Sequence, residues 1–266
     1  MSALLDHRVD GAGEPVVLLN GGMMTIANWD QAAERLKVRW QVIRCDLRGQ
    51  LLTPGPPFNA TIAEHVRDVV ELLDSLDVSR AHVVGTSFGA EVGLLLAATE
   101  PGRVASLVAA TATDWVTPEM RKEVLALSAA CGDAVSGRNR HGLYDLLAPI
   151  TYSPAYRASQ AAGLARRRAA VASLPDAWFM GTAGLLTALA DLDLRPRLAD
   201  ITCSVLVIIA GRDGIMPLER AQALTGAIRG AEEALVVTSG HALVVEQPDV
   251  FLALTEQFLF RHRATV

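Results

Sequence analysis

No apolar run in this sequence is long enough to cross a bilayer. A membrane-spanning helix needs about 20 consecutive apolar residues. Although 51% of the 266 residues are hydrophobic, the apolar stretches are much shorter. Residues 1–11 carry several charges and no apolar stretch followed by a small-residue cleavage site, so they do not resemble a signal peptide. We therefore expect a large apolar core, a cytoplasmic protein and no membrane partner.

Cysteine and positive charge are also scarce. Cys45, Cys131 and Cys203 are odd in number, lie far apart and show no C-x-x-C spacing or neighbouring histidine cluster. This pattern argues against a disulfide framework and against a zinc site, so we expect all three to be structural. A formal charge of −5 makes nucleic acid an unexpected partner. The small basic cluster 166–168 is predicted to be a solvated helix face.

Six short apolar runs alternate with helix-like segments. Their β-branched composition is typical of buried strands in a parallel sheet. The runs cover residues 16–20, 40–46, 81–87, 104–111, 204–211 and 233–239. Between them we expect helices over 28–37, 61–77 and 88–100, the second starting at a capping box of Thr61 and Glu64. The alternation predicts the α/β class, with a doubly wound, mostly parallel sheet.

The alternation stops after Ala112. Residues 113–198 contain no convincing strand but several Ala- and Leu-rich helical segments, interrupted at Pro118, Pro149, Pro154 and Pro175. We expect residues 1–112 and 199–266 to form one core domain. Residues 113–198 are predicted to form a helical cap, or lid, over the carboxyl ends of the strands, where open α/β sheets bind their ligands.

The sequence Gly85-Thr86-Ser87-Phe88-Gly89 follows an apolar run and opens a helical segment. This is the strand–turn–helix context in which a G-x-S-x-G sequence presents a serine nucleophile. We expect a sharp turn that strains the backbone of Ser87 and leaves no room for side chains at Gly85 and Gly89. A helix N-terminus favours developing negative charge, so the Phe88 N–H is a predicted oxyanion donor.

Together with two later stretches, this motif resembles the α/β-hydrolase fold superfamily over nearly the whole chain, in the branch of esterases, enol-lactonases and carbon–carbon bond hydrolases. In that family the acid follows a strand as G-x-D with a proline soon after, and VLVIIAGRDGIMP implies Asp213. The histidine follows the last strand as G-H before E-x-P, and TSGHALVVEQP implies His241. The resemblance also implies a helical lid inserted after the sixth strand of the fold.

The implied catalytic residues have distinct tasks. A serine hydroxyl is too weak an acid to attack unaided, so His241 would accept the proton of Ser87 as general base. Asp213 would hold the imidazole in the correct tautomer and offset its charge. Asp114 follows the run 104–111, where some members of the fold carry their acid, so it remains an alternative to Asp213.

The oxyanion loop departs from the family pattern. Where relatives usually show H-G-x, this sequence reads LLNGGMM, so Asn20 replaces the histidine. The second oxyanion N–H is expected from Gly22, with Met23 as its neighbour. Some lactonase-like members are similar in lacking this histidine, which favours an enol-lactone or ester substrate.

A second departure lies in CDLRGQLLTPGPP, where Gln50, Leu51 and Leu52 replace a familiar turn of the family. That loop generally borders the site in relatives, so its apolar character favours an adapted substrate over a generalist esterase. Asn28 is a candidate substrate contact, and a helix cap together with Gln31 is its alternative role.

Aromatic and methionine side chains of the predicted lid are candidates for an apolar substrate pocket. Stripes of this kind also form the core of a lid, and we expect substrate contacts chiefly at 178–180. The candidates are Trp115, Met120, Leu125, Tyr144, Leu147, Tyr152, Trp178, Phe179 and Met180.

These features predict a hydrolase that cleaves a carboxylic ester or lactone of a small, largely apolar molecule through an acyl-enzyme on Ser87, with no metal and no cofactor. A carbon–carbon bond hydrolase, or a cofactor-free oxygenase, lyase or cyclase on the same fold, is an alternative. So is a slow-turnover ligand-binding signalling protein. The expected partner is the small-molecule substrate, and the oligomeric state stays open, with a homodimer among the options.

Overall fold

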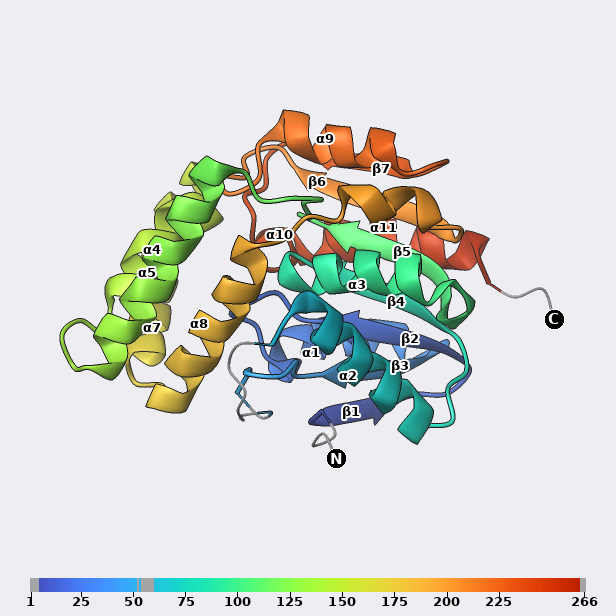
Figure 1. Ribbon diagram of the computed structural model, residues 1–266, viewed down its shortest axis with the longest axis horizontal. Coiled ribbons are helices and arrows are strands. Elements are labelled where there is room, and N and C mark those ends of the chain that lie inside the picture. Colours follow the sequence, from blue (N-terminus) through green and yellow to red (C-terminus); the bar gives the residue numbers. More distant parts are fainter. Residues whose placement is uncertain (1–4, 52, 54–59, 264–266) are drawn as a thin grey trace.

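The computed structural model describes residues 5–51, 53 and 60–263, and a seven-stranded sheet forms the centre of this part of the chain (Figure 1). The strands are β1 (His7–Asp10), β2 (Glu14–Leu19), β3 (Trp40–Cys45), β4 (Ala81–Thr86), β5 (Val104–Ala110), β6 (Ser204–Ala210) and β7 (Glu232–Val236). Their order is β1-β3-β2-β4-β5-β6-β7, parallel throughout except for β1, which pairs antiparallel with β3. The predicted mostly parallel, doubly wound sheet is confirmed. Strand β1 was not predicted, because HRVD holds a single apolar residue.

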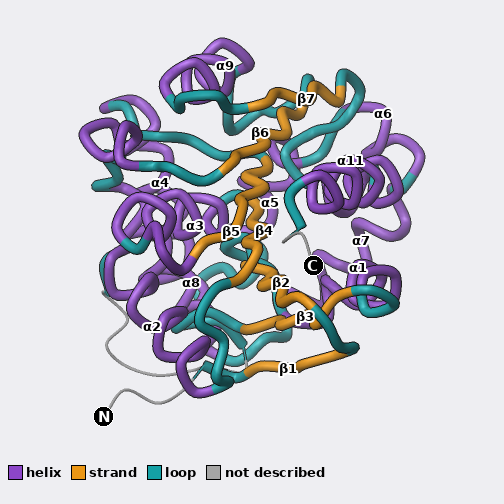
Figure 2. The backbone as a smooth tube through the Cα atoms, turned by 90° about the vertical axis from the view of Figure 1, so that its right-hand side faces the viewer, coloured by secondary structure: helices purple, strands orange, loops and turns teal. Residues whose placement is uncertain are grey.

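Helices cover both faces of the sheet (Figure 2). One face carries α2 (Ile62–Ser75), α3 (Phe88–Thr99) and α9 (Leu218–Ala227), and the other carries α1 (Asp30–Leu36), preceded by the 3-10 turn η1 (Ile26–Trp29), and α11 (Pro248–Arg261). Val83 and Val84 of β4 are both fully buried and belong to the clusters on opposite faces. The central parallel strands are therefore mostly apolar on both sides, because both of their faces are covered.

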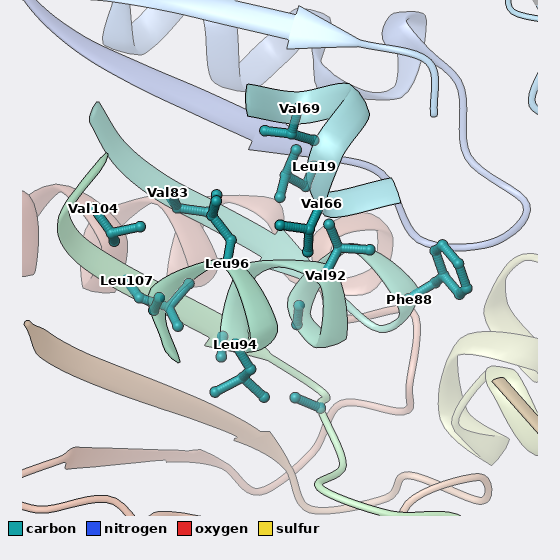
Figure 3. Close-up of a cluster of buried hydrophobic side chains, with 14 of the residues drawn as sticks. Leu19, Val66, Val69, Val83, Phe88, Val92, Leu94, Leu96, Val104 and Leu107 are labelled. Carbon is teal, nitrogen blue, oxygen red and sulfur yellow. The ribbon is translucent and has the colours of Figure 1, made fainter. Parts of the chain in front are cut away.

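The larger of the two clusters lies between the sheet and helices α2 and α3 (Figure 3). Leu107 of β5 and Leu19 of β2 pack there with Val66 of α2 and Val92 of α3. Burying a valine or leucine completely contributes about 1.5–3 kcal/mol relative to exposing it. This packing fixes α3, and with it the turn that precedes α3.

Helix α2 begins at the predicted capping box. The Thr61 hydroxyl accepts a hydrogen bond from the Glu64 backbone N–H at 3.3 Å, and the Glu64 carboxylate accepts one from the Thr61 N–H at 2.7 Å. The two groups satisfy backbone donors that a helix start leaves unpaired.

Five further α-helices lie between β5 and β6, ahead of the 3-10 helix η3 (Arg195–Asp200), and we call these five the helical insertion. They are α4 (Pro118–Val135), α5 (Gly142–Thr151), α6 (Pro154–Ser159), α7 (Ala161–Ala172) and α8 (Asp176–Ala190). Figure 1 shows α4, α5, α7 and α8 beside the sheet, at the end where α3 begins. The insertion follows the fifth described strand and not the sixth, because β1 is the only strand that the structure describes ahead of β2.

Three of the four prolines in the insertion stand at helix starts. Pro149 does not interrupt a helix as expected. Pro118 and Pro154 stand in the first turns of α4 and α6, and Pro175 caps α8. Pro149 lies inside α5, whose end at Thr151 is only two residues further on. At that position a proline removes one backbone hydrogen bond without breaking the preceding turns.

Helix α8 meets the core directly at Gly181. A Cβ atom at Gly181 would lie 1.8 Å from the carbonyl oxygen of Gly49. Gly49 itself has φ of +85°, a conformation that glycine adopts readily. The two backbones therefore touch with no side chain between them.

Candidate active site

Ser87 occupies a strained turn between β4 and α3. Its φ of 50° and ψ of −127° lie in a region that costs a non-glycine residue about 1–3 kcal/mol. A Cβ at Gly85 would lie 2.4 Å from the carbonyl oxygen of Gly89, and one at Gly89 would lie 2.3 Å from that of Leu19. The backbones thus pass as closely as the sequence predicts, and only glycine fits at either position.

Three loops bring Ser87, His241 and Asp213 together. His241 Nε2 lies 2.9 Å from Ser87 Oγ, and His241 Nδ1 lies 2.8 Å from Asp213 Oδ2. The other carboxylate oxygen of Asp213 accepts hydrogen bonds from the N–H groups of Ile215 and Met216, each at 2.8 Å. Both Asp213 oxygens are therefore held in place, and the carboxylate is 2% exposed.

The environment of His241 determines which nitrogen carries the proton. Burial lowers the pKa of His241, but the charge of Asp213 and its hydrogen bond outweigh burial, so the pKa lies above its ordinary value. An ionised carboxylate can only accept a hydrogen bond. In the neutral imidazole the proton is therefore on Nδ1, and the Nε2 lone pair faces the Ser87 hydroxyl.

Asp114 lies apart from this chain of hydrogen bonds. Its carboxylate is 3.5 Å from Arg220 Nη2. Burial raises the pKa of Asp114, and the positive charges of Arg220 and Arg195 oppose that rise. The structure brings Asp213, and not Asp114, to the histidine.

Glu91 is a buried acid near this site that the sequence analysis overlooked. It lies on α3, four residues after Ser87, and its Oε1 accepts a hydrogen bond from the Thr113 N–H at 2.9 Å. Burial raises the pKa of Glu91 to about 7, and the neighbouring His241 opposes the rise. A single glutamate in the apolar sequence FGAEVGLLLAAT is the signal that could have identified it.

The residues of the predicted oxyanion donors share one cavity with Ser87. Gly22, Met23 and Phe88 line the same cavity as Ser87. Within the described residues, the N–H groups of Gly22 and Met23 donate to no backbone or side-chain acceptor. The Phe88 N–H is the first of α3, so no helix carbonyl is available to it.

Asn20 and Gln50, the two departures from the family pattern, form one buried network. Asn20 Oδ1 accepts from Trp29 Nε1 at 2.7 Å, and its Nδ2 donates to Asp46 Oδ1 and Gln50 Oε1, both at 2.9 Å. Gln50 Nε2 then donates to the Gly21 carbonyl oxygen at 2.8 Å. Asn20 and Gln50 thus hold the backbone of the loop at Gly21 in place.

The described residues of the Gln50 loop do not line the cavity, and the expected adaptation of this loop to a particular substrate stays a prediction. Gln50 is 2% exposed and does not line the cavity, and Leu51 packs against the core of the insertion. Leu52 lies outside the described residues. The altered loop supports the backbone near the site and does not contact the cavity through its described residues.

The cavity beside Ser87 has a volume of about 300 Å³. Ligand pockets usually enclose about 300–1,000 Å³, so this one suits a small molecule. One wall comes from the core domain and the other from the helical insertion. The lining residues are Gly21, Gly22, Met23, Met24, Asn28, Thr86, Ser87, Phe88, Val124, Leu127, Tyr144, Leu147, Ala148, Thr151, Tyr152, Arg167, Val171, Thr182, Leu185, Leu186, Leu189, Ile215, His241, Ala242, Val244 and Val245.

Only part of the predicted lining reaches this cavity. Tyr144, Leu147 and Tyr152 line it, and so does Asn28, whose carboxamide oxygen also accepts a hydrogen bond from the Thr25 N–H at 2.8 Å. The remaining candidates do not line it, and they are Trp115, Met120, Leu125, Trp178, Phe179 and Met180.

Residues 178–180, where the chief substrate contacts are expected, do not line this cavity because they pack elsewhere. Trp178 and Phe179 are buried in the core of the insertion, with Leu127 and Leu143 in the same cluster, and Met180 points to the exposed side. The Trp115 ring instead packs against Arg195, whose guanidinium carbon lies 4.0 Å from the ring centroid. Trp178 and Phe179 thus pack inside the insertion, and Tyr144 and Tyr152 face the cavity.

The basic cluster 166–168 is not the uniform solvated face that was expected. Arg166 is exposed, and Arg168 forms a bidentate ion pair with Asp145 at 2.5 and 2.7 Å. Arg167 lines the cavity.

Metal-ligating side chains and cysteines are scattered through the described residues. No group of three or more His, Cys, Asp or Glu side chains there is arranged to hold a metal ion. Cys45, Cys131 and Cys203 are free thiols, and burial raises the pKa of Cys45 to about 12. Among the described helices none combines the length and the apolarity that crossing a membrane requires.

Known proteins resemble this chain over nearly its full length. Residues 14–248 match the family model of the alpha/beta hydrolase fold. A protein of Variovorax paradoxus (strain S110) named as the carbamate hydrolase RutD is 34% identical over an alignment 269 residues long, gaps included. The alignment covers 97% of this chain and 96% of the relative. Among solved structures, the enol-lactonase of Burkholderia xenovorans LB400 is 26% identical with a TM-score of 0.85, covering 96% of each chain. MGS-M2, an alpha/beta hydrolase from a Medee basin deep-sea metagenome library, is 22% identical with a TM-score of 0.92, covering 98% of this chain and 96% of MGS-M2.

Proposed function

The chain belongs to the alpha/beta hydrolase fold family, and on that premise we propose that it is a serine hydrolase that cleaves a carboxylic ester or lactone. The observation that carries the proposal is the hydrogen-bonded series from Ser87 through His241 to Asp213, which opens onto the cavity through Ser87 and His241. A nucleophile, a base and an orienting acid at hydrogen-bond distance are what acyl transfer requires.

In the first half of the proposed reaction Ser87 Oγ attacks the substrate carbonyl while His241 Nε2 takes the hydroxyl proton. The carbonyl oxygen becomes negatively charged and accepts hydrogen bonds from the N–H groups of Phe88 and Gly22, with Met23 beside them. Loss of one such donor typically costs about 10²–10³-fold in kcat. His241 then gives its proton to the leaving oxygen, and an acyl-enzyme on Ser87 remains.

In the second half water attacks the acyl-enzyme. His241 Nε2 accepts a proton from the water, the carbonyl oxygen again rests on the same backbone donors, and the carboxylic acid leaves as Ser87 regains its proton. Asp213 stays ionised throughout and stabilises the imidazolium form of His241. Neither half of the reaction needs a cofactor.

The substrate is proposed to bind between the core and the helical insertion. The insertion supplies the cavity wall opposite Ser87, through residues such as Leu127, Leu147 and Leu185. We propose that it acts as a lid and that residues 1–112 and 199–266 form the catalytic domain beneath it. The apolar wall favours a compact substrate with an apolar body.

A carbamate is the second candidate substrate. The relative at 34% identity that carries the name carbamate hydrolase favours it. A carbamate also has an electrophilic carbonyl carbon, bonded to an oxygen and a nitrogen, and the same three side chains and backbone donors would serve its cleavage.

Labelling with a fluorophosphonate reagent tests the nucleophile. Ser87 should be phosphonylated in the folded protein, and Ser87→Ala should not be labelled. A short 4-nitrophenyl ester, a small lactone and a phenyl carbamate, assayed side by side, then rank the substrate classes. If folded protein leaves Ser87 unmodified and cleaves none of the three, the proposal is wrong.

The same variants separate hydrolysis from a cofactor-free lyase, cyclase or oxygenase reaction. If Ser87 is the nucleophile, Ser87→Ala and His241→Ala should both lose at least about 10⁴-fold in kcat. Substantial turnover of a substrate by Ser87→Ala, together with none by His241→Ala, would instead assign proton abstraction to the His241–Asp213 pair.

A further inference from the structure

Apart from the titratable His241, Arg167 is the only side chain among the described cavity-lining residues that carries a charge near neutral pH. It extends from α7 of the insertion, whereas Ser87 and His241 belong to the opposite, core wall. The guanidinium keeps its positive charge at any working pH. A permanent cation on a mostly apolar wall is costly unless something compensates it.

No carboxylate of the described residues pairs with Arg167. The Arg167 Nη1 donates a hydrogen bond to the Tyr152 hydroxyl at 2.6 Å, and the guanidinium carbon lies 5.9 Å from the centroid of the same ring. Asp145 pairs with Arg168. Glu246 accepts hydrogen bonds from the N–H and the hydroxyl of Ser153, at 2.8 and 2.7 Å. The acids on neighbouring elements are thus committed elsewhere, and Arg167 retains most of its five N–H donors.

All three tyrosines of the sequence gather around this arginine. Tyr152 and Tyr156 stack with their ring centroids 5.4 Å apart, and Tyr144 lines the cavity from α5. The Tyr144 hydroxyl is buried and has no hydrogen-bond partner among the described residues. A buried phenol normally has such a partner. Burial raises the pKa of Tyr144 to about 12, so it remains a hydrogen-bond donor.

We propose that Arg167, assisted by the Tyr144 hydroxyl, binds a carboxylate at the end of the substrate remote from the scissile bond. This inference rests on the proposed function and specifies the substrate as an ester or lactone that also bears a free carboxylate. A guanidinium binds a planar carboxylate through two parallel hydrogen bonds. A phosphate dianion fits less well, since the cavity offers one positive charge and a volume of about 300 Å³.

The binding mode gives both ends of the substrate a role. The carboxylate on the insertion wall fixes one end, and the apolar body then lies between the walls with its carbonyl against Ser87. Binding at a distance from the reacting atoms orients the substrate and contributes to the rate of the chemical step. Arg167 is therefore a specificity-determining residue.

A pair of nearly isosteric esters tests the charge alone. Monomethyl esters of linear dicarboxylic acids from succinate to pimelate carry the carboxylate, and the matching ester amides replace it by a neutral carboxamide. The wild-type protein should prefer the best acid ester over its amide partner by about tenfold or more in kcat/KM, because charge-assisted hydrogen bonds are strong. Proton release in a pH-stat measures all of these reactions without a bulky leaving group.

Substitution of Arg167 should remove the preference. In Arg167→Met the ratio of the two kcat/KM values should fall to within about threefold of one, and Arg167→Lys should restore part of it. Arg166→Met, on the exposed side of the same helix, is the matched control and should keep the wild-type ratio. Because a ratio does not depend on the fraction of active protein, partial misfolding of a variant does not alter it.

The outcomes separate this inference from the proposed function. Cleavage of the neutral amide esters that depends on Ser87 but shows no preference for the carboxylate would overturn the inference and leave the hydrolase proposal intact. An equal loss on both esters in Arg167→Met would assign Arg167 a purely structural role and also overturn it. If no ester is cleaved, calorimetric binding of glutarate and adipate decides. Binding that Arg167→Met abolishes supports the carboxylate site, and absence of binding to the wild type refutes it.

Discussion

The two walls of the cavity follow different rules. On the core wall, backbone geometry dictates the residue: Ser87 stands at φ of 50° between two glycines that tolerate no side chain. On the insertion wall, helix packing dictates which residues face inward, and Trp178 and Phe179 are drawn into the interior of the insertion instead. The proposed catalytic residues therefore lie in a part of the molecule where backbone contacts restrict substitution, and the proposed substrate contacts lie in a part where side-chain packing restricts it less.

The largest expected effect lies on the core wall, at the acid. Asp213→Asn should lower kcat by about 10³–10⁴-fold, because an asparagine amide can donate to Nδ1 and so favours the wrong tautomer of His241. Asp114→Asn is the matched change in an acid that does not contact His241, and it should retain kcat within about threefold. Steady-state kinetics on one ester measure both, and the reverse ranking would assign the acid to Asp114.

The next effect concerns packing behind the nucleophile. Gly89→Ala should lower the free energy of unfolding by about 3 kcal/mol or more, or prevent folding, because the new Cβ would press on the Leu19 carbonyl in the middle of the sheet. Strand β2 is paired on both sides and cannot move away. Urea unfolding followed by circular dichroism measures the loss. Wild-type stability of Gly89→Ala would contradict the prediction, because it would show that the backbone can shift to accommodate the new Cβ.

A pH effect of similar size is expected at Glu91. Its folded-state pKa of about 7 lies above the ordinary value of 4.5, so the folded protein holds a proton that the unfolded chain has already released. The free energy of unfolding should therefore fall by up to about 3 kcal/mol as pH rises from 5 to 8.

Glu91→Gln cannot titrate and should lack this fall, while its carboxamide oxygen can still accept from the Thr113 N–H. Unfolding curves at pH 5 and pH 8 measure the difference. Glu100→Gln, at the exposed end of the same helix, should behave like the wild type. If Glu91→Gln keeps the wild-type pH dependence, Glu91 is ionised in the folded state.

A smaller effect is expected at the brace of the oxyanion loop. Gln50→Met keeps the volume but frees the Gly21 carbonyl, so the neighbouring Gly22 N–H should lose its alignment. We expect kcat to fall about tenfold with little change in KM, a fraction of what loss of an oxyanion donor costs. Gln31→Met, on the exposed face of α1, is the control. A change in thermal stability alone, with kcat intact, would limit Gln50 to a structural role.

The smallest effect lies in the insertion. Gly132→Ala in α4 should raise the free energy of unfolding by about 0.5–1 kcal/mol, because a Cβ there meets nothing within 4 Å and alanine favours a helix. The same substitution thus has opposite signs in the two regions. Destabilisation by Gly132→Ala would contradict the view that the insertion tolerates change.

On the core wall, Ser87 could be predicted from its strand–turn–helix context, and Asp213 and His241 from the resemblance of their motifs to the α/β-hydrolase superfamily. Each of the three follows an apolar strand, and parallel strands place their carboxyl ends at one edge of the sheet, where these side chains meet. The brace of Asn20 and Gln50 could not be predicted, because the two residues lie 30 positions apart and are joined only through the folded loop.

The insertion wall could not be predicted, because consecutive helical residues point about 100° apart and only packing decides which direction is inward. Arg166, Arg167 and Arg168 are one basic patch in the sequence, yet one is exposed, one lines the cavity and one pairs with Asp145. The positions of Trp178 and Phe179 could not be predicted for the same reason, because packing turns their side chains into the interior of the insertion and not toward the cavity.

The contact between Gly49 and Gly181 sets the clearance between the two walls. Since neither residue has a side chain, α8 already stands at the closest approach that two backbones allow, and any side chain gained at Gly181 must push the helix outward. Thr182 and Leu185 of α8 line the cavity and would move with it. A substitution at Gly181, which does not line the cavity, would thus change the cavity's width. Relatives could in this way accept bulkier molecules while Ser87, His241 and Asp213 stay unchanged.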